Sequence, residues 1–250
     1  MLRKRSKFGN RLTKTAKTAL NTAKQRIRRD KFGDWLRENP GGSFKEFYVE
    51  SVADALEGKT KHPSLGPRPT SSDRSRRNTF EKLVAQGIHP DDTVVDYGCG
   101  TLRIGGLFIE LLEPGRYIGL DIDDRILAAA LNRLSPQIIS SKQPVLEVIS
   151  PDSLRRTAAK RPRWVFSKGV LHHVPPEDLQ EYFQNLSCLI PAGATGLIRA
   201  RLSSKTRKIS PLTWMHEPNS LLAAAASCDM QLSEAETLPK WLMLRRRDSV

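Results

Sequence analysis

The feature that most constrains this chain is a short apolar strand that runs directly into a tight glycine turn, TVVDYGCGT at residues 93–101. Gly98 and Gly100 have no Cβ, so the backbone at these positions can take a positive φ and can approach a ligand closely. The pattern therefore predicts a ligand site immediately after this strand.

Helical and β-rich stretches alternate from residue 71 onward. Strands separated by helices indicate an α/β fold, a doubly wound and mostly parallel sheet with helices on both faces. No helical stretch separates the last two β-rich runs, so we expect them to pair as a hairpin and to make the final strand antiparallel. The expected helices are 76–87, 103–112, 124–134, 152–159, 176–187 and 218–228, and the expected strands are 93–96, 116–121, 145–149, 163–168 and 194–202, with final runs at 229–233 and 239–246.

Two carboxylates mark the ends of neighbouring strands. Asp96 stands two residues before Gly98, and Asp121 ends the next strand, 25 residues after Asp96. A dinucleotide fingerprint would need a third glycine at position 103, where this chain has Arg103. A carboxylate at Asp96 would also repel a pyrophosphate. The pair instead favours a cationic cofactor that carries a ribose.

With these motifs in this order, residues 74–247 resemble a class I S-adenosylmethionine (SAM) methyltransferase, and the resemblance implies a seven-stranded sheet. It also implies that Asp96 neutralises the methionine ammonium, that the two glycines let the backbone lie against the cofactor, and that Asp121 binds the ribose hydroxyls. Ile122 would pack near the adenine, and Ser167 would belong to the cofactor site. Asp152 would reach the adenine amine, or else cap a helix that begins at Ser153.

The chain departs from the family pattern at position 102, where the family commonly has glycine and this chain has Leu102. Gly105 is expected to take over the close packing of helix on strand. Arg103 would lie in the first turn of a helix, where a cation opposes the helix dipole. Its expected partner is the cofactor carboxylate, or alternatively Asp96 or a surface acid.

The run WVFSKGVLHHVP at residues 164–175 resembles the fourth strand of the family and the loop after it. Methyl transfer to a hydroxyl requires removal of a proton, and the ordinary histidine pKa of about 6.5 suits that task. His173 is the first candidate for the general base and His172 the second; alternatively, they pack against the cofactor and cap the loop. Lys168 either faces the pocket beside an anion of the acceptor or the cofactor, or is solvated.

The acceptor is expected to be a small molecule, a sugar or a lipid-linked glycan, methylated on oxygen. The Asn/Asp-Pro-Pro-aromatic run of amino-methylating nucleic-acid enzymes is missing after the fourth strand, and so are the carboxylates of metal-dependent catechol-type enzymes. We therefore expect no metal. Trp214 and His216 follow the fifth strand and are expected to form part of an acceptor lid, with packing as the alternative for Trp214.

Most of the net charge of +14 lies in a tail. Residues 1–31 hold twelve Lys and Arg against one Asp, with small apolar residues on one helical face. This basic amphipathic extension predicts peripheral contact with an anionic membrane. An RNA-binding arm, an organellar presequence or a solvated helix are the alternatives. Residues 32–73 form a connecting segment with one or two short helices, and 74–250 the SAM-binding domain.

The rest of the composition fits a protein of the cytoplasm. No apolar run approaches the length of ~20 residues that spans a bilayer, and no secretory signal is visible. The three cysteines have no disulfide or zinc spacing. Two other functions stay open: an RNA methyltransferase that uses the tail as an electrostatic arm, and a methyltransferase-like scaffold without activity.

Overall fold

The structure is a computed structural model that describes residues 30–59 and 73–247, so the predictions for the tail up to residue 29 lie outside the described residues. The chain divides between Gly42 and Ser43 into two compact units. The described part of the first unit is helix α2 (Lys31–Glu38), in which the rings of Phe32 and Trp35 stack. The second unit contains the sheet and the cavity described below.

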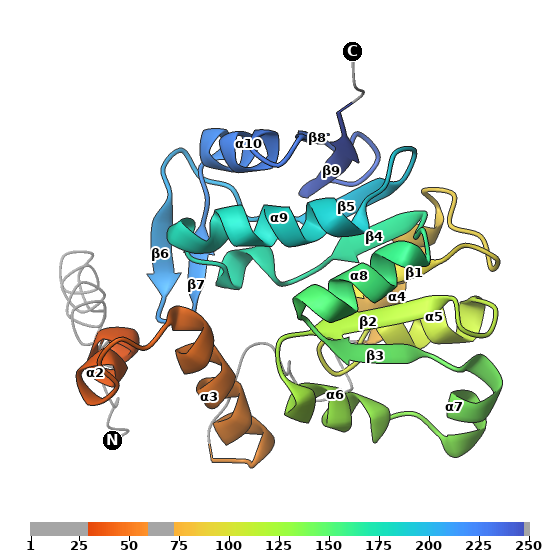
Figure 1. Cartoon of the computed structure of the whole chain (residues 1–250), viewed down its shortest axis with the longest axis horizontal. Helices are drawn as coiled ribbons and strands as arrows, with labels where there is room; N and C mark the ends of the chain where they lie inside the picture. The colour runs from red at the N-terminus through yellow and green to blue at the C-terminus, as the bar shows by residue number, and fades with distance from the viewer. Residues whose placement is uncertain (1–29, 60–72, 248–250) are drawn as a thin grey trace, which may run out of the picture. The chain divides into compact units, whose positions relative to one another are not determined.

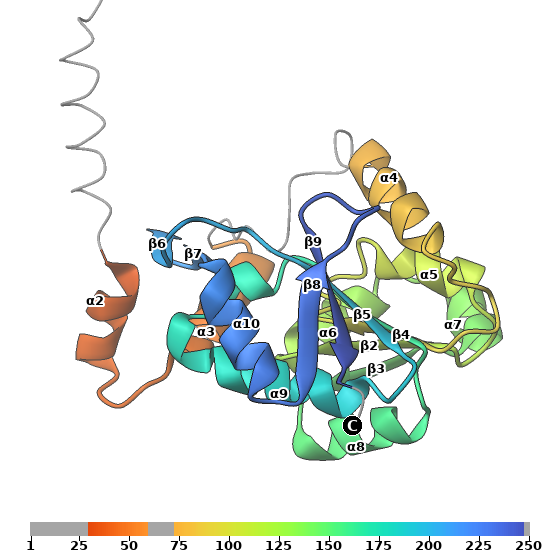
Figure 2. The same cartoon turned by 90° about the horizontal axis from the view of Figure 1, so that it is seen from above.

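The sheet has seven strands in the order β3-β2-β1-β4-β5-β9-β8 (Figures 1 and 2). Its first five strands in this order are parallel, whereas β9 runs antiparallel to both of its neighbours. The predicted seven-stranded, mostly parallel sheet with a terminal hairpin is confirmed. The strands are β1 (Val94–Tyr97), β2 (Tyr117–Asp121), β3 (Val145–Val148), β4 (Trp164–Ser167), β5 (Thr195–Arg199), β8 (Met230–Glu234) and β9 (Trp241–Arg246).

Apolar side chains cover both faces of the sheet, which is why the parallel strands are nearly continuous in hydrophobic residues. One core cluster packs α8 (Pro151–Ala159), α9 (Leu179–Leu189) and α10 (Pro218–Ala226) on one face. The other cluster packs α4 (Asp73–Val84), α5 (Gly105–Leu111) and α6 (Asp124–Leu131) on the opposite face. Figures 1 and 2 show these two layers of helices.

Three elements lie where no helix or strand was predicted. Helix α7 (Pro136–Lys142) begins at an N-cap serine followed by proline, and β6 (Arg207–Ser210) pairs with β7 (Thr213–Met215) as a separate hairpin. Predicted helix 176–187 is instead a 3₁₀ turn, Pro176–Asp178, followed by α9. A second 3₁₀ turn, Leu171–His173, follows β4.

Helix α3 (Phe44–Leu56) is the part of the connecting segment that belongs to the second unit. It begins at a capping box, in which Ser43 accepts the backbone N–H of Glu46 and the Glu46 carboxylate accepts the N–H of Ser43. Phe44, Phe47 and Val52 of this helix are buried against the rest of the unit. Within residues 30–59 and 73–247, no helix combines the length and apolar character needed to cross a bilayer.

Candidate active site

A cavity of about 1040 Å³ opens where the strand order reverses, between β1 and β4. Its wall is made by the carboxyl ends of β1, β2, β4 and β5 together with helix α3. Open α/β sheets bind ligands at such a switch point, because the loops after the two central strands diverge there. The volume is at the top of the range of about 300–1,000 Å³ that is common for small-molecule sites.

The glycine turn forms one wall of this cavity. Gly98 has a φ of +81°, and a Cβ at this position would lie 2.1 Å from the Val170 Cγ2. Gly100 also has a positive φ, and a Cβ there would meet no atom within 4 Å. Gly98 is therefore required both by its neighbour across the strand ends and by its backbone conformation, whereas Gly100 is required by its backbone conformation alone.

Asp121 and the turn are joined by hydrogen bonds. One Asp121 carboxylate oxygen accepts the N–H of Gly100 at 2.7 Å, and the other accepts the N–H of Ile122 at 2.8 Å. Burial nevertheless raises the pKa of Asp121 to about 6. Asp121 and Ile122 both line the cavity, at the position that the resemblance gives to a ribose and an adenine.

Asp96 is more deeply buried, with 4% of its surface exposed. Its carboxylate accepts a hydrogen bond from the Tyr117 hydroxyl at 2.9 Å, and burial raises its pKa to about 7. A cation that enters the cavity would stabilise the ionised form and lower this pKa. The pair of buried carboxylates thus makes this half of the cavity a site for a positively charged ligand.

Position 102, where the chain departs from the family pattern, keeps a backbone conformation that suits glycine although leucine occupies it. Leu102 holds a left-handed conformation with φ +56°, the conformation that a glycine would take without cost, and its side chain is buried. Gly105 provides the close packing that was expected of it, since a Cβ there would lie 2.1 Å from the Tyr117 hydroxyl oxygen.

Arg103 lines the cavity but lies before the helix, because α5 begins at Gly105. The prediction of a cation in the first helical turn is therefore wrong, and so is the dipole penalty attached to it. Among the described residues Arg103 makes no ion pair, with Asp96 or with a surface acid. Partial burial and the nearby Arg76 and Arg133 lower its pKa.

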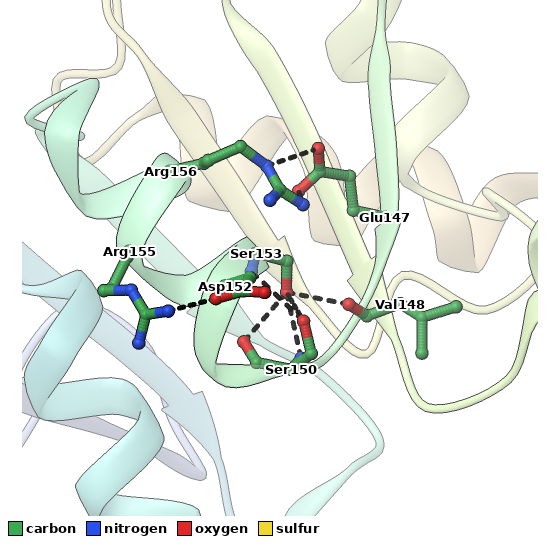
Figure 3. Close-up of polar contacts among 7 residues, drawn as sticks. All are labelled: Glu147, Val148, Ser150, Asp152, Ser153, Arg155 and Arg156. Atoms are coloured by element: carbon green, nitrogen blue, oxygen red, sulfur yellow. Dashed lines mark hydrogen bonds and ion pairs between the residues drawn. The ribbon is translucent and has the colours of Figure 1, made fainter.

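Asp152 is not among the residues that line the cavity, and the prediction that it caps a helix is wrong. Helix α8 begins at Pro151 with Ser150 as its N-cap, so Asp152 is not the capping residue. Its exposed carboxylate pairs with Arg155 one turn along the same helix (Figure 3). The cap is instead a reciprocal pair, in which Ser150 and Ser153 each accept the other's backbone N–H.

Ser167 is also outside the cavity lining, since it is buried and accepts the hydroxyl of Tyr182 at 2.9 Å. Trp214 and His216 are likewise absent from that lining. Trp214 packs edge-on against Phe44 of α3, with ring centroids 4.6 Å apart. His216 is 1% exposed and its Nε2 lies 3.1 Å from the Leu171 carbonyl oxygen, so it ties β7 to the loop after β4. The structure thus shows hydrogen bonds within the protein for Ser167 and His216 and packing for Trp214, whereas the ligand contacts expected of these residues stay predictions.

The two adjacent histidines both line the cavity, with ring centroids 4.1 Å apart. The His173 Nδ1 lies 2.6 Å from the Leu212 carbonyl oxygen, so the proton is held on Nδ1 and Nε2 is the nitrogen that can accept another. The His173 ring also lies 5.1 Å from that of Tyr48 on α3. His172 is less buried and makes no hydrogen bond to the described residues.

The expectation of an ordinary histidine pKa is wrong. Burial, followed by the charges of His173, Arg201 and Arg199, lowers the pKa of His172 to about 3. Burial lowers the pKa of His173 to about 4, although its contact with Leu212 acts in the opposite direction. Both rings are therefore neutral at pH 7, and each is a weaker base than a solvated histidine.

Two groups of lining residues were not predicted as site residues. Phe44, Lys45 and Tyr48 come from α3, and Arg199 and Arg201 come from the end of β5. The sequence carried a signal for the second group, since an apolar strand that ends in Arg-Ala-Arg places both cations on one side at the edge of the sheet. Within the described ranges, no three His, Cys, Asp or Glu side chains gather as a metal site.

No family model matches the sequence, and no curated protein sequence matches it. Solved structures do resemble it. Magnesium protoporphyrin IX methyltransferase from Synechocystis PCC 6803, crystallised with SAM, is 14% identical with a TM-score of 0.58 and covers 83% of this chain and 99% of its own. The CcbJ methyltransferase from Streptomyces caelestis is 14% identical with a TM-score of 0.52, and covers 80% of this chain and 98% of its own.

A third similar structure comes from work on the conversion of a disulfide bond into a thioacetal group in echinomycin biosynthesis. It is 17% identical with a TM-score of 0.55, and covers 80% of this chain and 93% of its own. At these identities the likeness concerns the fold. The fold of this chain is that of the class I methyltransferases.

Proposed function

We propose that this protein is a SAM-dependent methyltransferase that methylates a small molecule on oxygen. The observation that carries the proposal is the pair of buried carboxylates, Asp96 and Asp121, on either side of the Gly98–Gly100 turn in one cavity. A cationic ligand is what such a pair would stabilise, and the switch point of this fold is where it would bind.

The described residues fit SAM in chemical type. Asp96 and Arg103 would hold its ammonium and carboxylate ends, Asp121 its ribose, and Ile122 its adenine. When bound, SAM supplies the electrophilic methyl group. The protein's part is to align the acceptor with that methyl, to exclude water and to remove the acceptor proton.

His173 is the proposed general base and His172 the second candidate. The Leu212 carbonyl orients His173 and fixes its tautomer, which is the support that a catalytic base receives in other enzymes. Because its pKa in the empty cavity is about 4, the acceptor must raise that pKa when it binds if His173 is to take a proton efficiently.

The acceptor that we propose is a small metabolite, a sugar or a lipid-linked glycan. The cavity volume supports a small acceptor beside the cofactor. A lipid-linked acceptor would give a reason for the basic segment 1–31, which we propose as a contact with anionic membrane surfaces of the cytoplasm. The likeness to the methyltransferase structures above supports the reaction class.

The direct test of the cofactor is calorimetry of the purified full chain with SAM and with its demethylated product, SAH. We expect binding of both, and a loss of about 10- to 100-fold in affinity for Asp121→Asn, because a charge-assisted hydrogen bond to the ribose is weakened. Asp124→Asn, an exposed aspartate three residues away on α6, is the matched control and should bind normally. Binding of a nicotinamide nucleotide in place of SAM would refute the proposal.

The acceptor is sought by incubating the protein and labelled SAM with fractionated extract. Label is expected in small metabolites or lipid-linked glycan. Entry of label into RNA instead would favour a nucleic-acid methyltransferase. His173→Asn should remove turnover and leave SAH affinity within about twofold.

A further inference from the structure

The cavity has a second charged region, which is cationic. Six cationic side chains line the cavity, and three of them come from the ends of two adjacent strands: Lys168 after β4, and Arg199 and Arg201 at and beyond the end of β5. We call these three residues the cation cluster.

The members of the cation cluster act on one another and on the histidines. The charge of Arg199 helps to lower the pKa of Lys168 to about 8, after the larger effect of burial. Arg201 and Arg199 both lower the pKa of His172, and Arg201 lowers that of His173. The cluster therefore lies beside the proposed base.

No described residue pairs directly with the cation cluster, and the acid that acts on Lys168 is Asp96, whose charge raises the pKa of that lysine. None of its three side chains makes an ion pair or hydrogen bond with the described residues. Asp178 and Glu181 also line the cavity, but the charges that act on Lys168 are those of Arg199, Arg103 and Asp96. Arg199 and Arg201 are exposed, so solvent reduces their mutual repulsion, but like charges gathered in one site still raise the free energy of that site when it is empty.

The backbone around the cluster is fixed. The Arg201 carbonyl accepts the N–H of His216 at 3.0 Å, and the Ala200 N–H donates to the carbonyl of Lys240 at 3.2 Å. Lys240 itself lines the cavity from a left-handed conformation with φ +71°, which is costly for a lysine. Strain of this kind persists where the surrounding structure enforces it, and it occurs often in ligand sites.

We propose that the methyl acceptor carries a phosphate group, and that Lys168, Arg199 and Arg201 bind it. This inference rests on the proposed methyltransferase function and names its substrate class. A phosphate carries about −1.5 to −2 charges near neutral pH, and its oxygens match the fork of an arginine. It balances three cations better than a carboxylate does. The cofactor carboxylate would have another partner in Arg103.

A bound phosphate would also raise the pKa values of the two histidines, one of which is the proposed base. It would offset the charges of Arg199 and Arg201, which are two of the groups that hold down the pKa of His172. The other groups that lower this pKa are His173 and His216, and no acid is among them. The pKa of His173, which Arg201 lowers, would rise for the same reason. The acceptor's own anion would thus strengthen the base that deprotonates it.

The test is calorimetry of the full chain saturated with SAH, titrated with inorganic phosphate and, separately, with acetate. We expect phosphate to bind more tightly than acetate. The double variant R199Q/R201Q should weaken phosphate binding by about tenfold or more for each arginine removed, and should leave SAH affinity within about twofold. The matched control is R245Q/R247Q, which removes two exposed arginines at the same spacing at the end of β9, and it should bind phosphate normally.

The outcomes separate this inference from the proposed function. If SAH does not bind, the proposed function fails. If SAH binds but phosphate binding is equal in the wild type and in R199Q/R201Q, or is lost whenever SAH is present, only the phosphate site fails. Acetate binding as tight as phosphate binding would also overturn the inference of a phosphate site. The same holds if a single-stranded RNA binds far more tightly than phosphate through the same two arginines. Melting temperatures of the variants check that each is folded.

Discussion

The two halves of the cavity are built on different principles. The cofactor half, made by Asp96, Asp121 and the turn between Gly98 and Gly100, consists of buried carboxylates held by backbone N–H groups and a tyrosine hydroxyl. The half proposed for the acceptor, made by the cation cluster and the two neutral histidines, contains like charges that repel one another. The carboxylates of the first half already accept hydrogen bonds within the protein, whereas no described side chain forms an ion pair with the cations of the second.

The largest effect is expected from breaking the cofactor half at Gly98. Gly98→Ala adds a Cβ that would meet Val170 at 2.1 Å and forces an L-residue into φ +81°. We expect a loss of about 2–5 kcal/mol in the free energy of unfolding and loss of SAH binding. Urea unfolding and calorimetry measure the two effects.

Gly106 is the matched control for that substitution. It lies in α5, and a Cβ there would meet no atom within 4 Å. Gly106→Ala should be neutral or more stable by up to about 1 kcal/mol. Adding Val170→Ala to Gly98→Ala should restore part of the stability, and a failure to do so would show that the backbone conformation dominates the penalty.

The next largest effect is a dependence of stability on pH, which tests whether His173 is buried. The pKa of His173 is lowered to about 4 in the folded protein, so the unfolded chain takes up a proton first as the pH falls below about 6.5. The contribution of His173 to stability is therefore lost between about pH 6.5 and pH 4. Asp96 and Asp121, whose folded pKa values are raised, act in the opposite direction, so a comparison with a variant is needed.

His173→Asn supplies that comparison, since an asparagine amide can still donate to the Leu212 carbonyl. Between pH 7.5 and pH 5 the wild type should lose about 2 kcal/mol of unfolding free energy relative to this variant. Urea titrations at the two pH values give the difference. An equal difference at both would mean that His173 is solvated and not buried.

The smallest effect concerns Arg103, which lines the cavity and acts on the pKa of Lys168. Because it is partly exposed, Arg103→Gln should weaken SAH binding by no more than about fivefold, with phosphate affinity nearly unchanged. Calorimetry with each ligand measures both. If Arg103→Gln instead weakens phosphate binding more than SAH binding, Arg103 acts with the cation cluster and not with the groups proposed to bind SAM.

Much of the fold could be predicted because its signals are local. The apolar strands, the glycine turn and the helix starts depend on neighbouring residues, and the predicted sheet with its final hairpin is confirmed. Helix α7 and the β6–β7 hairpin were missed. The segment around β6 is polar and shows no alternation, and α7 is only seven residues long, so neither gives a strong periodic pattern.

The site was less predictable wherever position depended on packing. Asp152, Ser167, Trp214 and His216 were predicted because they lie at or after the ends of predicted strands, but their side chains contact Arg155, Tyr182, Phe44 and Leu171 respectively. The roles of Asp96, Asp121 and the histidines stay predictions. For these residues the structure adds their burial and their partners.

The sequence by itself determined the glycine turn, the acid at the end of each of the first two strands, and the histidine pair, because each is a short run of residue types. Only the tertiary structure decided that Lys168, Arg199 and Arg201 share one wall, and that the histidines are poor bases when the cavity is empty. The reason is that both properties depend on distance and burial between segments remote in the chain, and electrostatic energies change steeply with both.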